Sequence, residues 1–247
     1  MTIEMQLLEE KRKHLQSDHY ERNRMTFYRR KLFTNPLGEV LDIGSNSGEI
    51  LRQFSNMVTK ITVLDYDLAL SNAAKINLGD KCTVSICANA VCLPFRDQAF
   101  DTVMMLELIE HIPWKYHREC LGEAWRVLKP GGVFILSTPN ESSITSRTGK
   151  WQARKTGKSW EAWDSTHVAL YRAPNFLKAA WALEPASLKR CAYYYLPNQV
   201  SRSDWSIKTR LLHKFSSWIS LNTSGWQPMF GLGFHVLEVI LKPSSAR

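Results

Sequence analysis

The sequence predicts an α/β fold in which a parallel sheet carries helices on both of its faces. Three observations indicate this fold class. The 247 residues are enough for one large domain. A hydrophobic content of 44% and a charged content of 22% are typical of a globular protein. Strand and helix patterns alternate between residues 39 and 137, as in a parallel sheet whose ligand crevice lies at the carboxyl ends of its strands.

Hydrophobic periodicity predicts each element in turn. Two basic amphipathic helices come first, at residues 3–15 and 20–32. The strands of the core follow at residues 39–43, 61–64, 83–87, 102–106 and 132–137. The helices between these strands are expected at residues 48–57, 68–78 and 115–128. The later elements are a helix at 174–183, a strand at 188–196, an amphipathic helix at 204–221 and a final strand at 234–241.

The net charge of +9 is spread unevenly along the chain. Lys and Arg outnumber Asp and Glu by eight to five in residues 1–34 and by fifteen to six in residues 141–247. In residues 35–140 they are outnumbered by nine to twelve. Seven of the nine tryptophans lie beyond residue 150. The composition therefore changes near residues 139–140, from an acidic core to a basic, Trp-rich end.

A glycine-bracketed turn within residues 40–48, VLDIGSNSG, is the strongest local signal. Glycine lets the backbone approach a ligand closely, and exposed amides at a helix start can bind an anionic group. Asp65 follows the second predicted strand, 21 residues after Gly44, where an acid would recognise a ribose hydroxyl. This spacing predicts a nucleoside-binding crevice, and a tight turn that binds nothing is the alternative.

Four further motifs indicate which class of reaction this crevice serves. They are ANAVCLPFRDQAFD at 88–101, VMMLELIEHI at 103–112, WRVLKPGG at 125–132 and STPN at 137–140. With these motifs the sequence resembles the class I S-adenosylmethionine-dependent methyltransferases, in particular the branch of the ubiquinone-type O-methyltransferases. The resemblance is strong over residues 38–140 and thin from residue 164 to the end. It implies a Rossmann-like, seven-stranded, mostly parallel sheet with a reversed final strand.

The resemblance also implies a site for S-adenosyl-L-methionine, whose product is S-adenosyl-L-homocysteine. It places Asp42, Gly44 and Gly48 around the methionine moiety of this cofactor. Asp65 is expected on the ribose, and Tyr66 against the adenine.

Two residues depart from the family pattern. Asn46 replaces the usual central glycine of the first loop, and Asn89 replaces an Asp that faces the adenine amine, although an amide oxygen can also accept from an amine. Glu107 is expected to begin the loop beneath the sulfonium. The complete set of expected cofactor-binding residues is Asp42, Gly44, Ser45, Asn46, Gly48, Asp65, Tyr66, Asn89, Ala90 and Glu107.

Methyl transfer from a sulfonium needs the nucleophile and the methyl group held in line, and a base if the acceptor must lose a proton. His111, at the exit of the fourth strand, and His167, where related enzymes often have a histidine near the acceptor, are the candidate proton acceptors. A packing role for His111 and an ordinary loop position for His167 are the alternatives. His117 and His213 lie on amphipathic patterns and are expected at the surface. No spacing of two histidines and a carboxylate indicates a metal, so none is expected.

The expected reaction is O-methylation of a small-molecule acceptor that is anionic or carries a lipid or sugar. The basic, Trp-rich stretch 147–163 is the expected acceptor lid, with a solvated connection as the alternative. RNA methylation is the second hypothesis, because aromatic residues among basic ones suit stacked bases and phosphates. A cofactor-binding scaffold without turnover is a third. A dehydrogenase is disfavoured, because its fingerprint gives no role to residues 93–95, 110–111 and 129–132.

Four segments are therefore expected. They are a helical N-terminal cap (1–34), a cofactor-binding core (35–140), a basic acceptor lid (141–185), and C-terminal strands with an amphipathic helix that complete the core sheet (186–247). The absence of a signal-peptide pattern and of C-x-x-C pairs favours a soluble, cytoplasmic protein without a transmembrane segment. Residues 204–221 are expected to pack in the core, and peripheral contact with a membrane is the alternative. The sequence does not indicate an oligomeric state.

Overall fold

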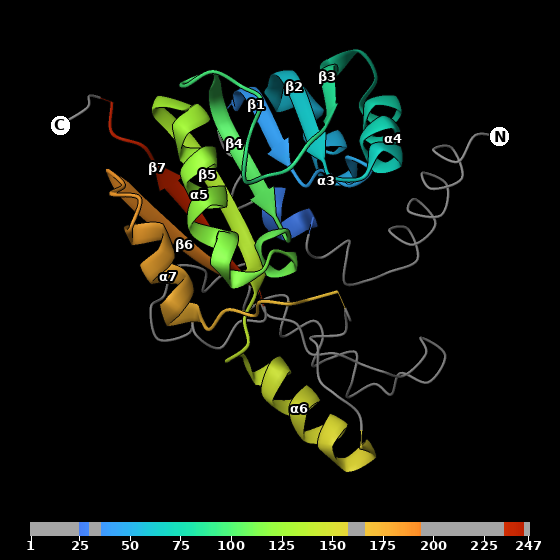
Figure 1. Cartoon of the computed structure of the whole chain (residues 1–247), viewed down its shortest axis with the longest axis vertical. Coiled ribbons are helices and arrows are strands. Elements are labelled where there is room, and N and C mark those ends of the chain that lie inside the picture. The colour runs from blue at the N-terminus through green and yellow to red at the C-terminus, as the bar shows by residue number, and fades with distance from the viewer. Residues whose placement is uncertain (1–24, 30–35, 158–165, 194–234, 245–247) are drawn as a thin grey trace.

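A computed structural model of the chain describes residues 25–29, 36–157, 166–193 and 235–244 (Figure 1). Within these residues, seven strands form one sheet in the order β3-β2-β1-β4-β5-β7-β6. The strands are β1 (Gly38–Ile43), β2 (Val58–Asp65), β3 (Cys82–Cys87), β4 (Phe100–Leu106), β5 (Leu128–Pro139), β6 (Ser187–Tyr193) and β7 (His235–Leu241). β7 runs antiparallel to both of its neighbours, and the other pairs are parallel. The predicted Rossmann-like, mostly parallel sheet with a reversed final strand is confirmed.

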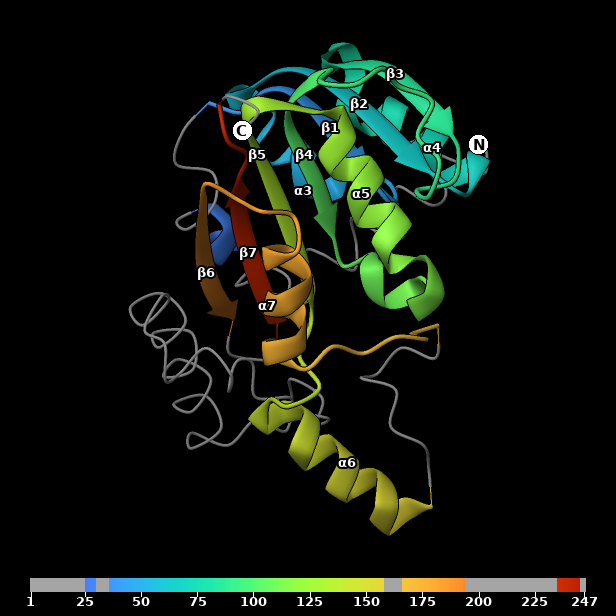
Figure 2. The same cartoon turned by 60° about the vertical axis from the view of Figure 1, so that its left-hand side comes forward.

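Helices pack on both faces of this sheet. They are α3 (Glu49–Arg52), α4 (Leu68–Leu78), α5 (His117–Val127) and α7 (Ala173–Trp181). α5 and α7 cover one face, and α3, α4 and the helical residues 25–29 lie against the other (Figure 2). Each face has its own core, because successive side chains of a strand point to opposite faces. In β4, Val103 and Met105 belong to the core beneath α5, whereas Met104 belongs to the opposite core.

The helix predicted at residues 48–57 is wrong in extent. α3 ends at Arg52, and a short 3-10 turn at Ser55–Met57 follows it. Gly48 precedes α3 in the left-handed region, with a φ of 71°, and supplies no side-chain cap. A helix that begins without a capping side chain and on a glycine gains little local stabilisation, so it stays short.

Helix α6 (Ile144–Thr156) was not predicted as a helix, although its ends carry ordinary signals. The Ser143 side chain accepts a hydrogen bond from the amide of Ser146, and Gly157 follows the last turn with a φ of 69°. α6 starts beyond the carboxyl end of β5 and extends away from the sheet (Figure 1). The described part of the expected lid, residues 141–157 and 166–185, therefore contains one projecting helix, α6, and one helix that packs on the sheet, α7.

Other predicted elements agree with the structure or fall outside the described residues. α4 begins and ends where the periodicity predicts it, at residues 68 and 78. The predicted helices at 3–15 and 204–221 lie outside the described residues, as does most of 20–32. Within the described part of the chain, no helix is long and apolar enough to cross a membrane.

Candidate functional site

The turn between β1 and α3 lies at the carboxyl edge of the sheet, in contact with the exit of β4. Gly44 has a φ of 73°, a backbone conformation that glycine adopts without strain. A Cβ at Gly44 would lie only 2.7 Å from Cδ1 of Leu108, which follows β4. At Gly48, where φ is 71°, a Cβ would lie 3.1 Å from Cδ1 of Leu78. Gly44 is therefore required both for its conformation and for the space that it leaves.

Asn46 occupies the position of the expected central glycine and keeps the backbone conformation that a glycine would allow. Its φ is 50°, in the left-handed region that Asn tolerates better than most residues. Its side-chain oxygen accepts a hydrogen bond from the Ser47 amide at 2.8 Å. The departure from the family pattern is therefore compatible with the geometry of the turn.

Every backbone amide from residue 44 to residue 48 has an acceptor within the protein. The amides of Gly44 and Ser45 both donate to the Leu64 carbonyl, and the amide of Asn46 donates to the Asp65 carboxylate. The amide of Ser47 donates to the Asn46 side-chain oxygen, and that of Gly48 to the Ser45 carbonyl. At these five positions the expected anion-binding amides are thus engaged by acceptors in the turn and at the end of β2. What the turn offers a ligand is a rigid, close-lying backbone with little side-chain bulk.

Asp65, at the end of β2, is held by two backbone amides. Its Oδ2 accepts from the amide of Asn46 at 2.8 Å, and its Oδ1 accepts from the amide of Asp67 at 3.0 Å. Asp67 in turn caps α4, because its side chain accepts from the amide of Ala69 at 2.7 Å. Tyr66 stands beside them with 81% of its surface exposed. Each oxygen of Asp65 keeps a further acceptor position, as recognition of a ribose requires.

Asp42 lies within β1, with 5% of its surface exposed. Burial, and then the negative charge of Asp65, raise the pKa of Asp42 to about 7. A carboxyl group that is normally ionised is therefore partly protonated near neutral pH. A perturbed acid at the end of a strand in a crevice is a feature of functional sites.

Asn89 and Ala90 follow β3. Asn89 is exposed, and its side-chain oxygen accepts from the amide of Val91 at 3.1 Å while its carbonyl accepts from the amide of Cys92 at 3.1 Å. Ala90 is buried. The Asn89 oxygen thus closes its own turn and still has one acceptor position for a ligand.

Glu107 follows β4 in a conformation that is uncommon for a residue with a side chain, with a φ of 55°. Ser137 of the neighbouring strand β5 donates from Oγ to Oε1 of Glu107 at 2.5 Å. The amide of Glu107 donates to the Ser137 carbonyl at 3.1 Å. Ser137 therefore orients the expected sulfonium-loop residue, a role that the sequence analysis missed. The neighbouring positions of β4 and β5 in the sheet are what place it there.

These expected cofactor residues gather at one edge because β3, β2, β1 and β4 are adjacent and parallel. The chain order reverses between β1 and β4, and ligands of open α/β sheets bind at such a reversal. The Gly44 turn and Glu107 lie on either side of it.

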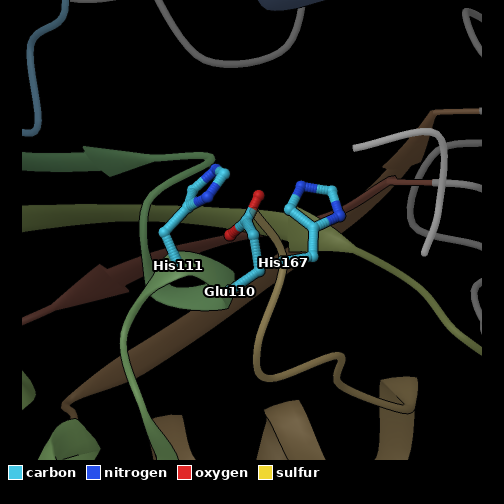
Figure 3. Close-up of side chains that lie close together, drawn as sticks. All are labelled: Glu110, His111 and His167. Atoms are coloured by element: carbon cyan, nitrogen blue, oxygen red, sulfur yellow. The ribbon is translucent and has the colours of Figure 1, made fainter. Parts of the chain in front are cut away.

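The two candidate histidines lie side by side, although 56 residues separate them in the chain. The ring centroids of His111 and His167 are 4.8 Å apart. Glu110, with no exposed surface, points its carboxylate between the two rings (Figure 3). One ligand atom from each of the three residues lies within 4.8 Å of the others. The sequence predicted both histidines at the site, but it did not indicate that Glu110 lies between them.

Backbone and hydroxyl groups hold this cluster in place. The amides of Val168 and Ala169 both donate to the Glu110 carbonyl, at 2.9 and 3.0 Å. Thr138 of β5 donates from Oγ1 to Oε2 of Glu110 at 3.0 Å. The Thr166 hydroxyl and Nδ1 of His111 are 2.9 Å apart. Thr138 belongs to the motif at 137–140, but the sequence did not indicate its contact, and no motif included Thr166, because each threonine contacts a residue far from it in the chain.

The expectation that His117 is a surface residue is wrong. His117 is buried at the start of α5, with Nδ1 2.7 Å from the Tyr171 hydroxyl and Nε2 2.6 Å from the Ile112 carbonyl. Burial lowers the pKa of His117. Its place in the helical pattern did not reveal the partner, since Tyr171 comes from the segment before α7. His213 lies outside the described residues.

The base of α6 is tied to the sheet by polar contacts. The Asn140 side-chain oxygen accepts from the amides of Ser142 and Ala173, both at 3.1 Å. Lys150 of α6 lies 2.7 Å from a carboxylate oxygen of Glu141. Further along α6, Trp151 is 60% exposed, and the Lys155 ammonium stands 3.7 Å from its ring centroid.

The strand order, the reversed β7 and the crevice at the carboxyl edge define a class I methyltransferase fold. Residues 41–136, which contain β1 to β4 and most of β5, match the methyltransferase domain family. The chain therefore carries a class I S-adenosylmethionine-dependent methyltransferase domain, as its motifs predicted.

Comparisons with known proteins support this assignment for the core. The chain is 32% identical over 110 residues to 24-methylenesterol C-methyltransferase 2 of Oryza sativa subsp. japonica, covering 42% of this chain and 30% of that protein. It is 30% identical over 169 residues to 27-O-demethylrifamycin SV methyltransferase of Amycolatopsis mediterranei, covering 64% and 58%. The chain thus spans less than two thirds of these relatives. A methyltransferase structure from Thermotoga maritima shares the fold, with a TM-score of 0.63, 15% identity and coverage of 96% and 97%.

Proposed function

We propose that this protein transfers a methyl group from S-adenosyl-L-methionine to a hydroxyl oxygen of a small-molecule acceptor. One observation carries the proposal. The Gly44 turn, Asp65 and Glu107, which the methyltransferase motifs contain, meet at the strand-order reversal beside the Glu110, His111 and His167 cluster. A donor site and a set of proton-handling groups therefore lie at the same edge of the sheet.

The cofactor half of the site is suited to a nucleoside. Asp65 would accept from the ribose hydroxyls, and the exposed Tyr66 ring would lie against the adenine. The Gly44 and Gly48 backbone would admit the methionine moiety, next to Asp42. The smaller contributions to the shape of this site would come from Ser45, Asn46, Asn89, Ala90 and Glu107.

The chemical step is an in-line displacement. The acceptor oxygen attacks the methyl carbon, the bond between carbon and sulfur breaks, and its electron pair stays on sulfur as S-adenosyl-L-homocysteine. The hydroxyl proton passes to His111 or His167, because imidazole can accept a proton at neutral pH. Holding the two reacting atoms in line supplies most of the acceleration.

The chemistry of α6 supports an anionic acceptor, and residues 141–185 would form its lid. Ile144, Arg147, Trp151, Arg154 and Lys155 are all exposed on this helix. Their cationic and apolar groups together suit an acceptor that joins an anionic group to a lipid or a sugar.

RNA is the second candidate acceptor, favoured by the contact of Lys155 with the Trp151 ring. An exposed aromatic ring flanked by cations can stack on a base and bind a phosphate. Salt distinguishes the two acceptors, since RNA affinity should fall steeply as counterions compete for the phosphates.

The direct test is to supply cell extract with methyl-labelled S-adenosyl-L-methionine and the purified protein, and to identify labelled products by mass spectrometry. We expect label on a small hydroxylated molecule, and label on RNA would favour the second candidate. Absence of labelled product together with binding of S-adenosyl-L-homocysteine would favour a scaffold without turnover.

Calorimetry with S-adenosyl-L-homocysteine tests the cofactor half separately. Asp65→Ala should weaken binding by about 1–3 kcal/mol, the usual effect of losing a hydrogen bond to a charged group. Asp80→Ala, which removes an exposed carboxylate after α4, is the control. Preferential binding of NAD(H) would contradict the proposal.

A further inference from the structure

We propose that Glu110, His111 and His167 bind one divalent transition-metal ion, and that this ion receives the acceptor oxygen. The role of the ion in catalysis rests on the function proposed above, whereas the binding of the ion does not. Among the described residues, these three bring two imidazoles and a buried carboxylate within 4.8 Å of one another.

The donor set fits such an ion. Two histidines and one carboxylate on one side of a metal leave its other positions open, as in catalytic zinc, iron and manganese sites. Ligand bonds of about 2.0–2.2 Å place the donor atoms of a shared ion roughly 3–4 Å apart. The ligand atoms now lie within 4.8 Å of one another, so a closure of about 1 Å would bring them to a shared ion. Figure 3 shows the carboxylate and both rings directed toward a common space.

The groups around the cluster orient its ligands as outer partners do in metal sites. The Thr138 hydroxyl donates to Oε2 of Glu110 at 3.0 Å and so fixes the direction of this carboxylate. The Thr166 hydroxyl lies 2.9 Å from Nδ1 of His111, which leaves Nε2 to coordinate. Such partners fix the ring orientation and commonly contribute about 10- to 100-fold to metal affinity.

The backbone also joins the two segments that supply the ligands. The amides of Val168 and Ala169 donate to the Glu110 carbonyl, so residue 167 is held next to Glu110 before any ion arrives. A site that is largely formed in advance costs little conformational entropy on binding.

The position of the cluster indicates the substrate class. His111 ends the 3-10 turn Ile109–His111, only four residues after Glu107, so an ion would stand on the acceptor side of the crevice. Two open positions favour an acceptor with two neighbouring oxygens, such as a catechol, a vicinal diol or a 2-hydroxy acid. Metal binding acidifies a bound hydroxyl. Its proton would then leave to water as the bound oxygen attacks the methyl carbon and the bond from that carbon to sulfur breaks. With the ion bound, the imidazoles would act as ligands, and they would accept the proton directly only in its absence.

The experiment measures metal binding without turnover. The full chain is freed of metal with a chelator and titrated with Co²⁺, whose visible absorption reports coordination, and with Mn²⁺ followed by electron paramagnetic resonance. We expect one equivalent to bind, and affinity to fall at least about 100-fold in His167→Ala and His111→Ala. Glu110→Gln should behave alike, whereas Glu119→Gln, an exposed carboxylate on α5, should match the wild type.

Thr166→Val tests the orienting contact and should weaken binding about 10-fold without abolishing it. If Glu110→Gln does not fold, the two histidine variants still decide the matter. Unchanged Co²⁺ affinity in both histidine variants, or no stoichiometric binding by the wild type, would overturn the metal site. Binding of S-adenosyl-L-homocysteine is measured in the same samples. If S-adenosyl-L-homocysteine binds but no metal does, the metal site is wrong and the proposed function stands. If S-adenosyl-L-homocysteine does not bind, the result counts against the proposed function instead.

Discussion

The two halves of the candidate site differ in the groups that form them, which are mainly backbone groups in one half and side chains in the other. The cofactor half, between Gly44 and Asp67, is mostly backbone: of five consecutive amides, three donate to Leu64 and Asp65 at the end of β2 and two donate within the turn. The acceptor half consists of side chains, with Glu110, His111 and His167 brought together across 56 residues of chain. Backbone turns fix a shape that suits one common cofactor. Side chains set the chemistry and can change from one acceptor to another without disturbing that shape.

The largest effect we expect comes from the acceptor half. His111→Ala and His167→Ala should each lower turnover by about 100- to 10,000-fold, because each ring either accepts the hydroxyl proton itself or holds the ion that acidifies the hydroxyl. Binding of S-adenosyl-L-homocysteine should not change, because neither ring contributes to the turn around Gly44. Turnover with saturating cofactor and calorimetry on the same samples would check this. Near-normal turnover in both variants would mean that transfer proceeds by proximity alone.

The cofactor half should respond to changes of backbone space. Gly44→Ala places a Cβ 2.7 Å from the Leu108 side chain in a residue with a φ of 73°. We expect a loss of unfolding free energy of about 3 kcal/mol, from left-handed strain of about 1–2 kcal/mol and overpacking of similar size. Gly157→Ala isolates the strain, because Gly157 is left-handed with a φ of 69° and nothing lies within 4 Å of the added Cβ. Equal losses in urea unfolding would show that the Leu108 contact is unimportant.

Asp42, in the cofactor half, makes the free energy of unfolding depend on pH. Its pKa is raised from 3.8 to about 7, so the stability that its protonated form provides is fully present below pH 3.8 and is lost as pH rises through about 7. Asp42→Asn should therefore match the wild type near pH 4 and exceed its unfolding free energy at pH 8 by on the order of 2–4 kcal/mol.

Urea unfolding without cofactor at a series of pH values would measure this difference. Asp80→Asn, on an exposed carboxylate, should show no comparable trend. A constant difference between Asp42→Asn and the wild type from pH 4 to pH 8 would contradict the raised pKa.

The contrast between the halves also explains which features the sequence could predict. The turn at 40–48 and Asp65 depend on contacts between consecutive elements, so local spacing is informative. The reason Asn46 fits is local as well, since Asn tolerates a positive φ. The contacts of Ser137, Thr138 and Thr166 could not be predicted, although the first two lie in the motif at 137–140, because their partners come from other strands or loops.

The errors have physical causes too. His117 has the helical spacing of a surface residue, yet Tyr171 covers it from a later segment. The sequence contains the end signals of α6, Ser143 and Gly157. The helix was not predicted because the region was interpreted from its charge and tryptophan content, which describe a surface rather than an element. A pattern along one element thus reveals its own ends and faces, and a contact between distant segments requires the fold.

The smallest effect we expect is on acceptor affinity, and it comes from the exposed charges of α6. Reversing Arg154 and Lys155 to Glu should weaken acceptor affinity several-fold to roughly tenfold, since exposed charges each contribute about 1 kcal/mol or less. Lys150 is unsuitable for this test, because its contact with Glu141 ties α6 to the end of β5. Lys189→Glu, at an exposed position of β6 outside the lid, is the control. Acceptor KM at two salt concentrations, with calorimetry for the cofactor, would measure the effect. An acceptor KM indifferent both to the reversal and to salt would show that these cations form only a solvated surface.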